Sequence, residues 1–116
     1  MAVVAPASPP RQAEEYRDGL ARLRDLYDVR RAWSPGQERG YLSAPDPTRA
    51  AALNAAIEDP SVRAVLSVRG GYGSLRLLDR LDWAAARRQP TLLVGYSDIT
   101  ALHLAFYAKA RWTGLS

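Results

Sequence analysis

The sequence predicts one α/β domain, in which a parallel sheet is covered by helices on both faces in a flavodoxin-like or Rossmann-like three-layer arrangement. Its 116 residues, 47% of them hydrophobic, suit a single domain with its own core. Short apolar segments alternate four times with segments in which apolar residues recur every three or four positions. Strands separated by helices are joined by right-handed crossovers and lie parallel, which is why we expect this sheet.

The first apolar segment, Ala2–Ala5, predicts a buried strand that ends in a proline-rich turn. A helix is expected next, from about Pro9 to Tyr27, with Ser8 as its N-cap. Its apolar stripe consists of Ala13, Tyr16, Leu20, Leu23 and Tyr27.

A second strand is expected over Val29–Trp33, followed by a long loop, Ser34–Pro45. Asp46 then begins a helix that ends at Asp59, because a proline follows each of these two residues. A third strand, Val62–Val68, leads into the glycine-rich part of the chain.

The glycine-rich segment Arg69–Gly73 interrupts the chain before a short helix over residues 75–81. Asp82 is suited to cap another helical turn. The most apolar strand, Thr91–Gly95, and a last helix that begins near Asp98 complete an order of β-α-β-α-β-α-β-α.

The composition of the chain excludes several kinds of catalytic site and of binding partner. The chain has no cysteine, which excludes thiol catalysis, cysteine-bound zinc and disulfides, and neither a metal nor another cofactor is expected. Its net charge of +4 comes from arginines that are interleaved with acidic residues, so no nucleic-acid partner is expected. No apolar run approaches the ~20 residues that span a bilayer. Since the start of the chain also lacks the charged segment of an export signal, we expect a cytoplasmic protein without membrane contact.

Three segments that follow strands should meet, because ligands of such sheets bind outside the carboxyl ends of the strands. They are Pro6–Pro9, Arg69–Gly73 and Gly95–Thr100. In the third segment, Ser97 lies between a buried strand and a helix, as the serine of a nucleophile elbow does. Ile99 stands where that motif has its second glycine, so an ordinary helix N-cap is the alternative for Ser97.

The run Gly70-Gly71-Tyr72-Gly73 would let backbone amides approach an anion, and a tight turn without a ligand is the alternative. Arg76 stands where a dinucleotide-binding fingerprint needs its third glycine.

His103, the only histidine, lies six helical positions after Ser97, about 600° of rotation and ~9 Å of rise away. We therefore expect a packed histidine rather than a base. For Asp98, a capping role is favoured over a catalytic one.

Together these segments resemble the LD-carboxypeptidase family of serine peptidases, which includes murein tetrapeptide carboxypeptidases and microcin-immunity peptidases. The resemblance covers nearly the whole chain. It rests on Ala5-Pro6-Ala7-Ser8-Pro9, on Arg69-Gly70-Gly71-Tyr72-Gly73 with Arg76-Leu77-Leu78, on Leu81-Asp82-Trp83, and on Gly95-Tyr96-Ser97-Asp98-Ile99-Thr100-Ala101-Leu102.

The resemblance implies that Ser97 is the nucleophile and that two backbone N–H groups form the oxyanion hole. These are the N–H groups of Asp98 and Gly71, with Gly70 as the alternative to Gly71. In the family a Glu and a His from a second, C-terminal domain complete the triad, and this chain stops where members of the family continue. Residues 1–116 are thus expected to be an N-terminal nucleophile domain, inactive without the missing C-terminal domain.

The implied substrate is a muropeptide, cleaved at an L-to-D amide bond so that terminal D-alanine is released during cell-wall recycling. Arg69 and Tyr72 are the expected substrate-binding residues. A homodimer is compatible with the sequence as well. Two other hypotheses stay open: a non-catalytic module that binds a peptide or carboxylate on the same fold, and a nucleotide-binding α/β domain.

Overall fold

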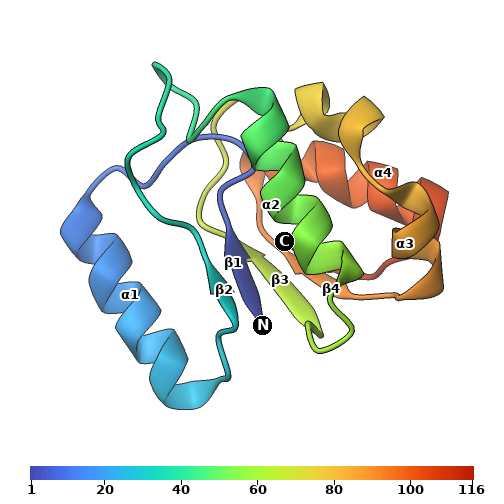
Figure 1. Ribbon diagram of the computed structural model, residues 1–116, viewed down its shortest axis with the longest axis horizontal. Coiled ribbons are helices and arrows are strands. Elements are labelled where there is room, and N and C mark those ends of the chain that lie inside the picture. The colour runs from blue at the N-terminus through green and yellow to red at the C-terminus, as the bar shows by residue number, and fades with distance from the viewer.

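The computed structural model describes residues 1–116 and contains one sheet of five parallel strands in the order β2-β1-β3-β4-β5 (Figure 1). The strands are β1 (Ala2–Val4), β2 (Arg31–Ala32), β3 (Ala64–Ser67), β4 (Leu92–Val94) and β5 (Gly114–Leu115). The helices are α1 (Ala13–Leu26), α2 (Asp46–Glu58), α3 (Trp83–Arg88) and α4 (Thr100–Ala110), with 3₁₀ turns η1 (Leu75–Arg80) and η2 (Ser97–Ile99). None of the helices combines the length and the apolar character needed to cross a membrane. The α/β class with a parallel sheet is confirmed.

The sheet has two different faces, because alternate residues of a strand point to opposite sides. Val4, Val65 and Leu93 belong to a core of 19 buried residues, to which α2, α3 and α4 also contribute. Val3 and Leu66, their neighbours along β1 and β3, instead line a cavity together with α1. Helices therefore lie on both faces, as expected, with α1 on one face and α2, α3 and α4 on the other.

Aromatic packing anchors the last part of the chain. The ring of Phe106 in α4 stacks on Trp112, with centroids 4.3 Å apart, and contacts Trp83 of α3 at 5.0 Å. The Trp112 indole N–H also donates a hydrogen bond of 2.8 Å to the Ala86 carbonyl. Burying one such side chain contributes about 1.5–3 kcal/mol, so α3, α4 and the chain after α4 form one firmly packed unit.

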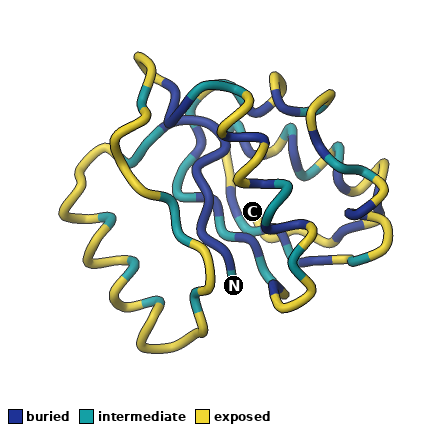
Figure 2. The backbone as a smooth tube through the Cα atoms, in the orientation of Figure 1, coloured by how far each residue is buried: buried dark blue, intermediate teal, exposed yellow.

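Helix α1 begins later than the sequence suggests. It starts at Ala13 with Gln12 as N-cap, so the expected start at Pro9 and the expected Ser8 cap are wrong. Ser8 is buried, and its backbone N–H donates to the Gly70 carbonyl at 3.3 Å. No residue of α1 is fully buried, and Figure 2 shows the helix exposed along almost its whole length.

Strand β5 is a feature that the sequence does not reveal. The N–H groups of Leu93 and Gly95 donate to the carbonyls of Thr113 and Leu115, at 3.2 and 2.9 Å. This strand has two residues, one of them a glycine, and so carries no apolar run. The expected cap of α3 is confirmed, because the Asp82 carboxylate accepts a hydrogen bond of 2.8 Å from the Ala85 N–H.

Candidate functional site

The three segments that follow β1, β3 and β4 meet at one edge of the sheet, as the sequence predicts. The Ser8 N–H bonds to Gly70 across the first two segments. Gly70 in turn lies against Ser97, at the end of β4. The position outside the carboxyl ends of the strands is the usual ligand site of an open parallel sheet.

Ser97 has the backbone conformation of a sharp, strained turn. Its φ is +62°, in the left-handed region that non-glycine residues seldom adopt. Its side chain is exposed and caps neither η2 nor α4, so the N-cap alternative is wrong. Strain of this kind costs about 1–3 kcal/mol and clusters at functional sites.

Only glycine fits at position 70. A Cβ there would lie 2.8 Å from the Ser97 Cβ and 3.0 Å from the Asp98 backbone nitrogen. The glycine-rich loop thus approaches the elbow as closely as the backbone allows, which was expected from its composition.

The peptide bond between Gly70 and Gly71 has a fixed orientation. Its carbonyl accepts the hydrogen bond from Ser8, and a trans peptide places its N–H, that of Gly71, on the opposite side. Gly71 has a φ of +126°, and a Cβ on it would lie 2.0 Å from the Ser8 Oγ. The N–H groups of Gly71 and Asp98 take no part in the hydrogen bonds of the turns and loops, and both are free to bind an oxyanion.

The Asp98 side chain holds the glycine-rich loop. Its carboxylate accepts a hydrogen bond of 2.9 Å from the Ser74 N–H. The expected capping role differs from this finding: the Asp98 carboxylate forms no capping hydrogen bond with η2 or α4 and binds a distant segment instead. Its own backbone N–H stays available beside Ser97.

Arg49 of α2 is a functional-site residue that the sequence reasoning missed. It is 2% exposed, and its guanidinium donates to the carbonyls of Ala44 and Gly73, at 2.9 and 3.0 Å, and to that of Pro6. It also forms an ion pair with Asp46. The sequence contains one indication of this role: Arg49 lies one turn before Leu53 on the apolar face of α2. A buried charge at such a position needs hydrogen-bonding partners inside the protein.

Asp46 links Arg49 to the surface. Its carboxylate also accepts hydrogen bonds of 2.9 Å from Arg76 of η1. Burial raises the pKa of Asp46, but hydrogen bonds from Arg76 and Arg49 and the charges of both outweigh burial and hold that pKa below its usual value. The carboxylate is therefore a permanent anion that keeps the two arginines in place at neutral pH.

His103 is packed and hydrogen-bonded, as expected. Its Nε2–H donates to the Gly95 carbonyl at 2.8 Å, and its ring lies against Gly114 of β5. The side chain of this histidine is therefore held between the residue that follows β4 and strand β5. The structure contains no group of three or more His, Asp or Glu side chains that could hold a metal ion.

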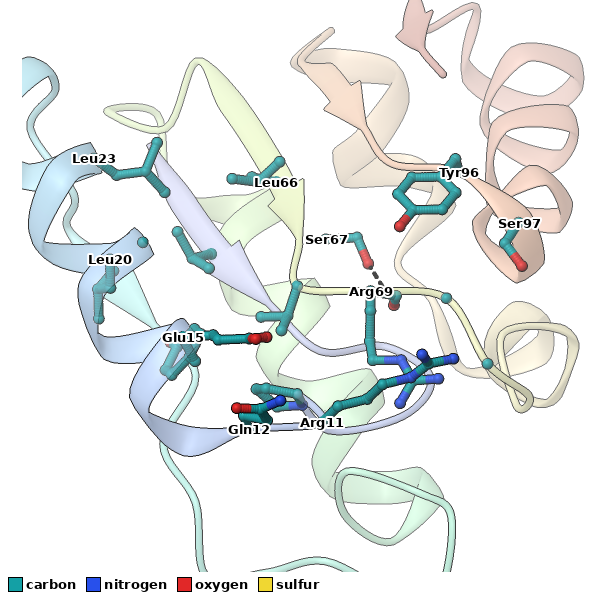
Figure 3. A pocket seen from close by; sticks show the side chains of 17 residues that line it. Arg11, Gln12, Glu15, Leu20, Leu23, Leu66, Ser67, Arg69, Tyr96 and Ser97 are labelled. Carbon is teal, nitrogen blue, oxygen red and sulfur yellow. Dashed lines mark hydrogen bonds between the residues drawn. The ribbon is translucent and has the colours of Figure 1, made fainter.

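A cavity of about 650 Å³ extends from Ser97 and Tyr96 to α1, and Figure 3 shows Arg11 and Arg69 between these two borders. The Arg69 guanidinium donates to the Pro9 carbonyl at 3.3 Å. Tyr72 does not line the cavity; it is exposed and packs edge-on against Tyr41, with ring centroids 5.9 Å apart. The two expected substrate-binding side chains thus lie in different surroundings.

The sequence is similar to those of known carboxypeptidases. A sequence profile described as the LD-carboxypeptidase N-terminal domain matches residues 1–116. The chain is 46% identical over 115 residues to a putative carboxypeptidase of Streptomyces coelicolor, covering 94% of this chain and 36% of that protein. It is 37% identical over 114 residues to a probable murein peptide carboxypeptidase of Bacillus subtilis, covering 97% and 34%.

Solved structures show the same fold. A MccF-like protein from Bacillus anthracis superimposes with a TM-score of 0.86 at 33% identity, covering 97% of this chain and 35% of that one. A muramoyltetrapeptide carboxypeptidase from Oxalobacter formigenes superimposes with a TM-score of 0.79 at 29% identity, covering 91% and 36%. The chain spans about a third of the length of these proteins.

Proposed function

Because the chain belongs to the LD-carboxypeptidase family, we propose that residues 1–116 are the N-terminal nucleophile domain of a serine peptidase. The enzyme hydrolyses the L-to-D amide bond of muropeptides and releases the terminal D-alanine during cytoplasmic cell-wall recycling. The observation that carries this proposal is the strained turn at Ser97, which packs against Gly70. The backbone N–H groups of Asp98 and of Gly71, the next residue of the loop, have no partners in turns or loops.

The proposed reaction passes through an ester on Ser97. The Ser97 Oγ attacks the scissile carbonyl carbon and gives its proton to a base, and the carbonyl oxygen gains the negative charge. The N–H groups of Asp98 and Gly71 bind this oxyanion. The C–N bond then breaks, and the departing amine takes the proton from the base. Water hydrolyses the ester by the same route and restores the serine.

The base is expected from outside this chain, because the Nε2–H of His103 already donates a hydrogen bond to the Gly95 carbonyl. A C-terminal domain would provide the Glu and the His that complete the triad. In this proposal the isolated chain is inactive, since donors for the oxyanion give only a residual rate enhancement without a base. In this proposal two side chains contact the substrate. Arg69 lines the cavity, and Tyr72, three residues later, is exposed.

The decisive test is Ser97→Ala in the full-length protein. We expect release of D-alanine from muramoyl tetrapeptide to stop, because loss of a nucleophile lowers kcat by many orders of magnitude. Ser34→Ala, at another exposed serine, is the matched control and should keep full activity.

Retention of more than about a tenth of the activity by Ser97→Ala would overturn the assignment. The chain 1–116, assayed alone and then with a separately expressed C-terminal domain, gives a second answer. Full activity of the chain alone, abolished by His103→Ala, would mean that the base lies within residues 1–116. A protein that binds the peptide without cleaving it would be the binding module that the fold also permits.

A further inference from the structure

The cavity beside Ser97 has one strongly basic border. Arg11, which precedes α1, and Arg69, which follows β3, both line it. In Figure 3 both side chains extend into the part of the cavity between α1 and Ser97. The two residues are 58 positions apart in the sequence, so only the fold brings them together.

Neither guanidinium is neutralised by this chain. All five ion pairs of the structure involve other arginines: Arg17, Arg30, Arg31, Arg49 and Arg76. Arg69 donates one hydrogen bond to the Pro9 carbonyl, and Arg11 is exposed. Two neighbouring cations with free N–H groups suit a carboxylate, which a guanidinium can bind through two parallel hydrogen bonds.

Arg69 begins close to the elbow. Gly70 lies in contact with Ser97, and Arg69 is the next residue along the loop. In a peptide that loses its last residue, the terminal carboxylate lies one residue beyond the scissile carbonyl, about 3.5 Å of extended chain. An arginine that starts one residue from the elbow has the reach to hold this group.

The cavity contains one carboxylate as well. Glu15 lines it from the first turn of α1 and forms no ion pair with either guanidinium. The two guanidinium groups outnumber this single carboxylate, so the charges that line the cavity favour a ligand carboxylate overall.

We propose that Arg11 and Arg69 form the subsite for the terminal carboxylate of the substrate, which restricts cleavage to the last residue of a peptide. This inference rests on the proposed peptidase function and adds the group that makes it a carboxypeptidase. Arg11 is a specificity-determining residue that no sequence pattern singles out. The leaving amino acid lies between Ser97 and the two guanidinium groups.

The test compares two substrates of the full-length protein: a muramoyl tetrapeptide that ends in D-alanine and the same peptide that ends in D-alaninamide. We expect Arg69→Met and Arg11→Met each to lower kcat/KM for the acid by about 10-fold or more, the loss of a charge-assisted hydrogen bond, with little change for the amide. The double variant should no longer distinguish the two substrates. Arg69→Lys should keep part of the preference. Arg22→Met, at an exposed arginine of α1, is the matched control.

Two outcomes overturn the inference: equal losses for acid and amide, or a preference for the acid that survives in the double variant. Binding of both peptides to Ser97→Ala protein, measured by calorimetry, separates this result from the fate of the proposed function. Tighter binding of the acid that depends on both arginines supports the subsite even if no cleavage is found. Cleavage by the wild type, with acid and amide treated alike by every variant, supports the peptidase and excludes the subsite.

Discussion

Arg49 is a buried cation that holds two of the three segments around Ser97. It donates to the Pro6 carbonyl in the first segment and to the Gly73 carbonyl in the second. Gly73 itself must be a glycine, because a Cβ there would lie 2.9 Å from the Arg49 Nη1. The guanidinium therefore sets the distance between the two loops that flank the elbow.

Arg49→Met should destabilise the protein by about 3 kcal/mol, because it leaves buried carbonyls and the Asp46 carboxylate without their partner. Urea denaturation followed by circular dichroism measures the change. Arg63→Met, at an exposed arginine outside any ion pair, should stay within about 0.5 kcal/mol of the wild type. An equally small effect at Arg49 would mean that water replaces the guanidinium at no cost.

The roles of single residues were only partly predictable. The turn around Ser97 could be predicted because a buried strand, a small residue and a helix start follow one another within a few positions. The left-handed φ of Ser97 could not be predicted. Neither could the hydrogen bonds of Arg49 to Pro6 and Gly73, which lie 43 and 24 residues away in sequence. An arginine on an apolar helix face signals a buried network without naming its members.

At the scale of elements, the glycine-rich loop has no room for a side chain at its glycine positions. Gly70 lies against the elbow, and Gly71 lies against Ser8. The loop is tied at Ser74 to the Asp98 carboxylate. Its shape is thus set from both neighbouring segments before any ligand binds.

Gly71→Ala should destabilise the protein by at least about 1 kcal/mol, because alanine at a positive φ is strained and its Cβ would displace Ser8. Gly19→Ala is the matched control in the exposed interior of α1, where a Cβ meets nothing within 4 Å. There alanine should raise stability by roughly 0.5–1 kcal/mol. Thermal denaturation of both variants checks the two opposite signs, and a neutral Gly71→Ala would contradict the crowding against Ser8.

Elements with a clear period were predictable, and elements made by pairing were not. The apolar runs and helical stripes located β1, α2, β3, β4 and α4 within a few residues. The start of α1 was misplaced because Ser8-Pro9 looks like a cap and a first turn, whereas Ser8 is used to bind Gly70. Strand β5 exists only because Thr113 and Leu115 meet the edge of β4.

For the whole molecule, the convergence of the three segments followed from topology. Parallel strands end at the same edge, so their loops had to meet there. The cavity under α1 was not predictable, because it depends on how far this helix stands from the sheet. The amphipathic stripe of α1 predicted only which of its sides would face inward.

The stability of the whole molecule should decrease in acid through the Asp46 network. Its pKa in the folded protein lies below the usual 3.8, so the stabilisation is present above that value and is lost as the pH falls through the folded pKa. Unfolding free energies measured from about pH 6 to pH 2 should fall less steeply for Asp46→Asn than for the wild type. Asp18→Asn, exposed on α1, should keep the wild-type slope, and equal slopes for all three proteins would exclude Asp46 as a source of the acid loss.

Helix α1 has no fully buried residue and is joined to the sheet across a cavity, with one hydrogen bond of 2.7 Å from the Tyr16 hydroxyl to the Trp33 carbonyl. Such a helix lies at the low end of the local unfolding scale, since few apolar contacts are lost when it opens. Its amide hydrogens will exchange with solvent through a local opening that leaves α2, α3 and α4 closed. A ligand that spans the cavity from Arg69 to α1 has to close this opening when it binds. The free-energy cost of ordering the helix therefore lowers the affinity for that ligand.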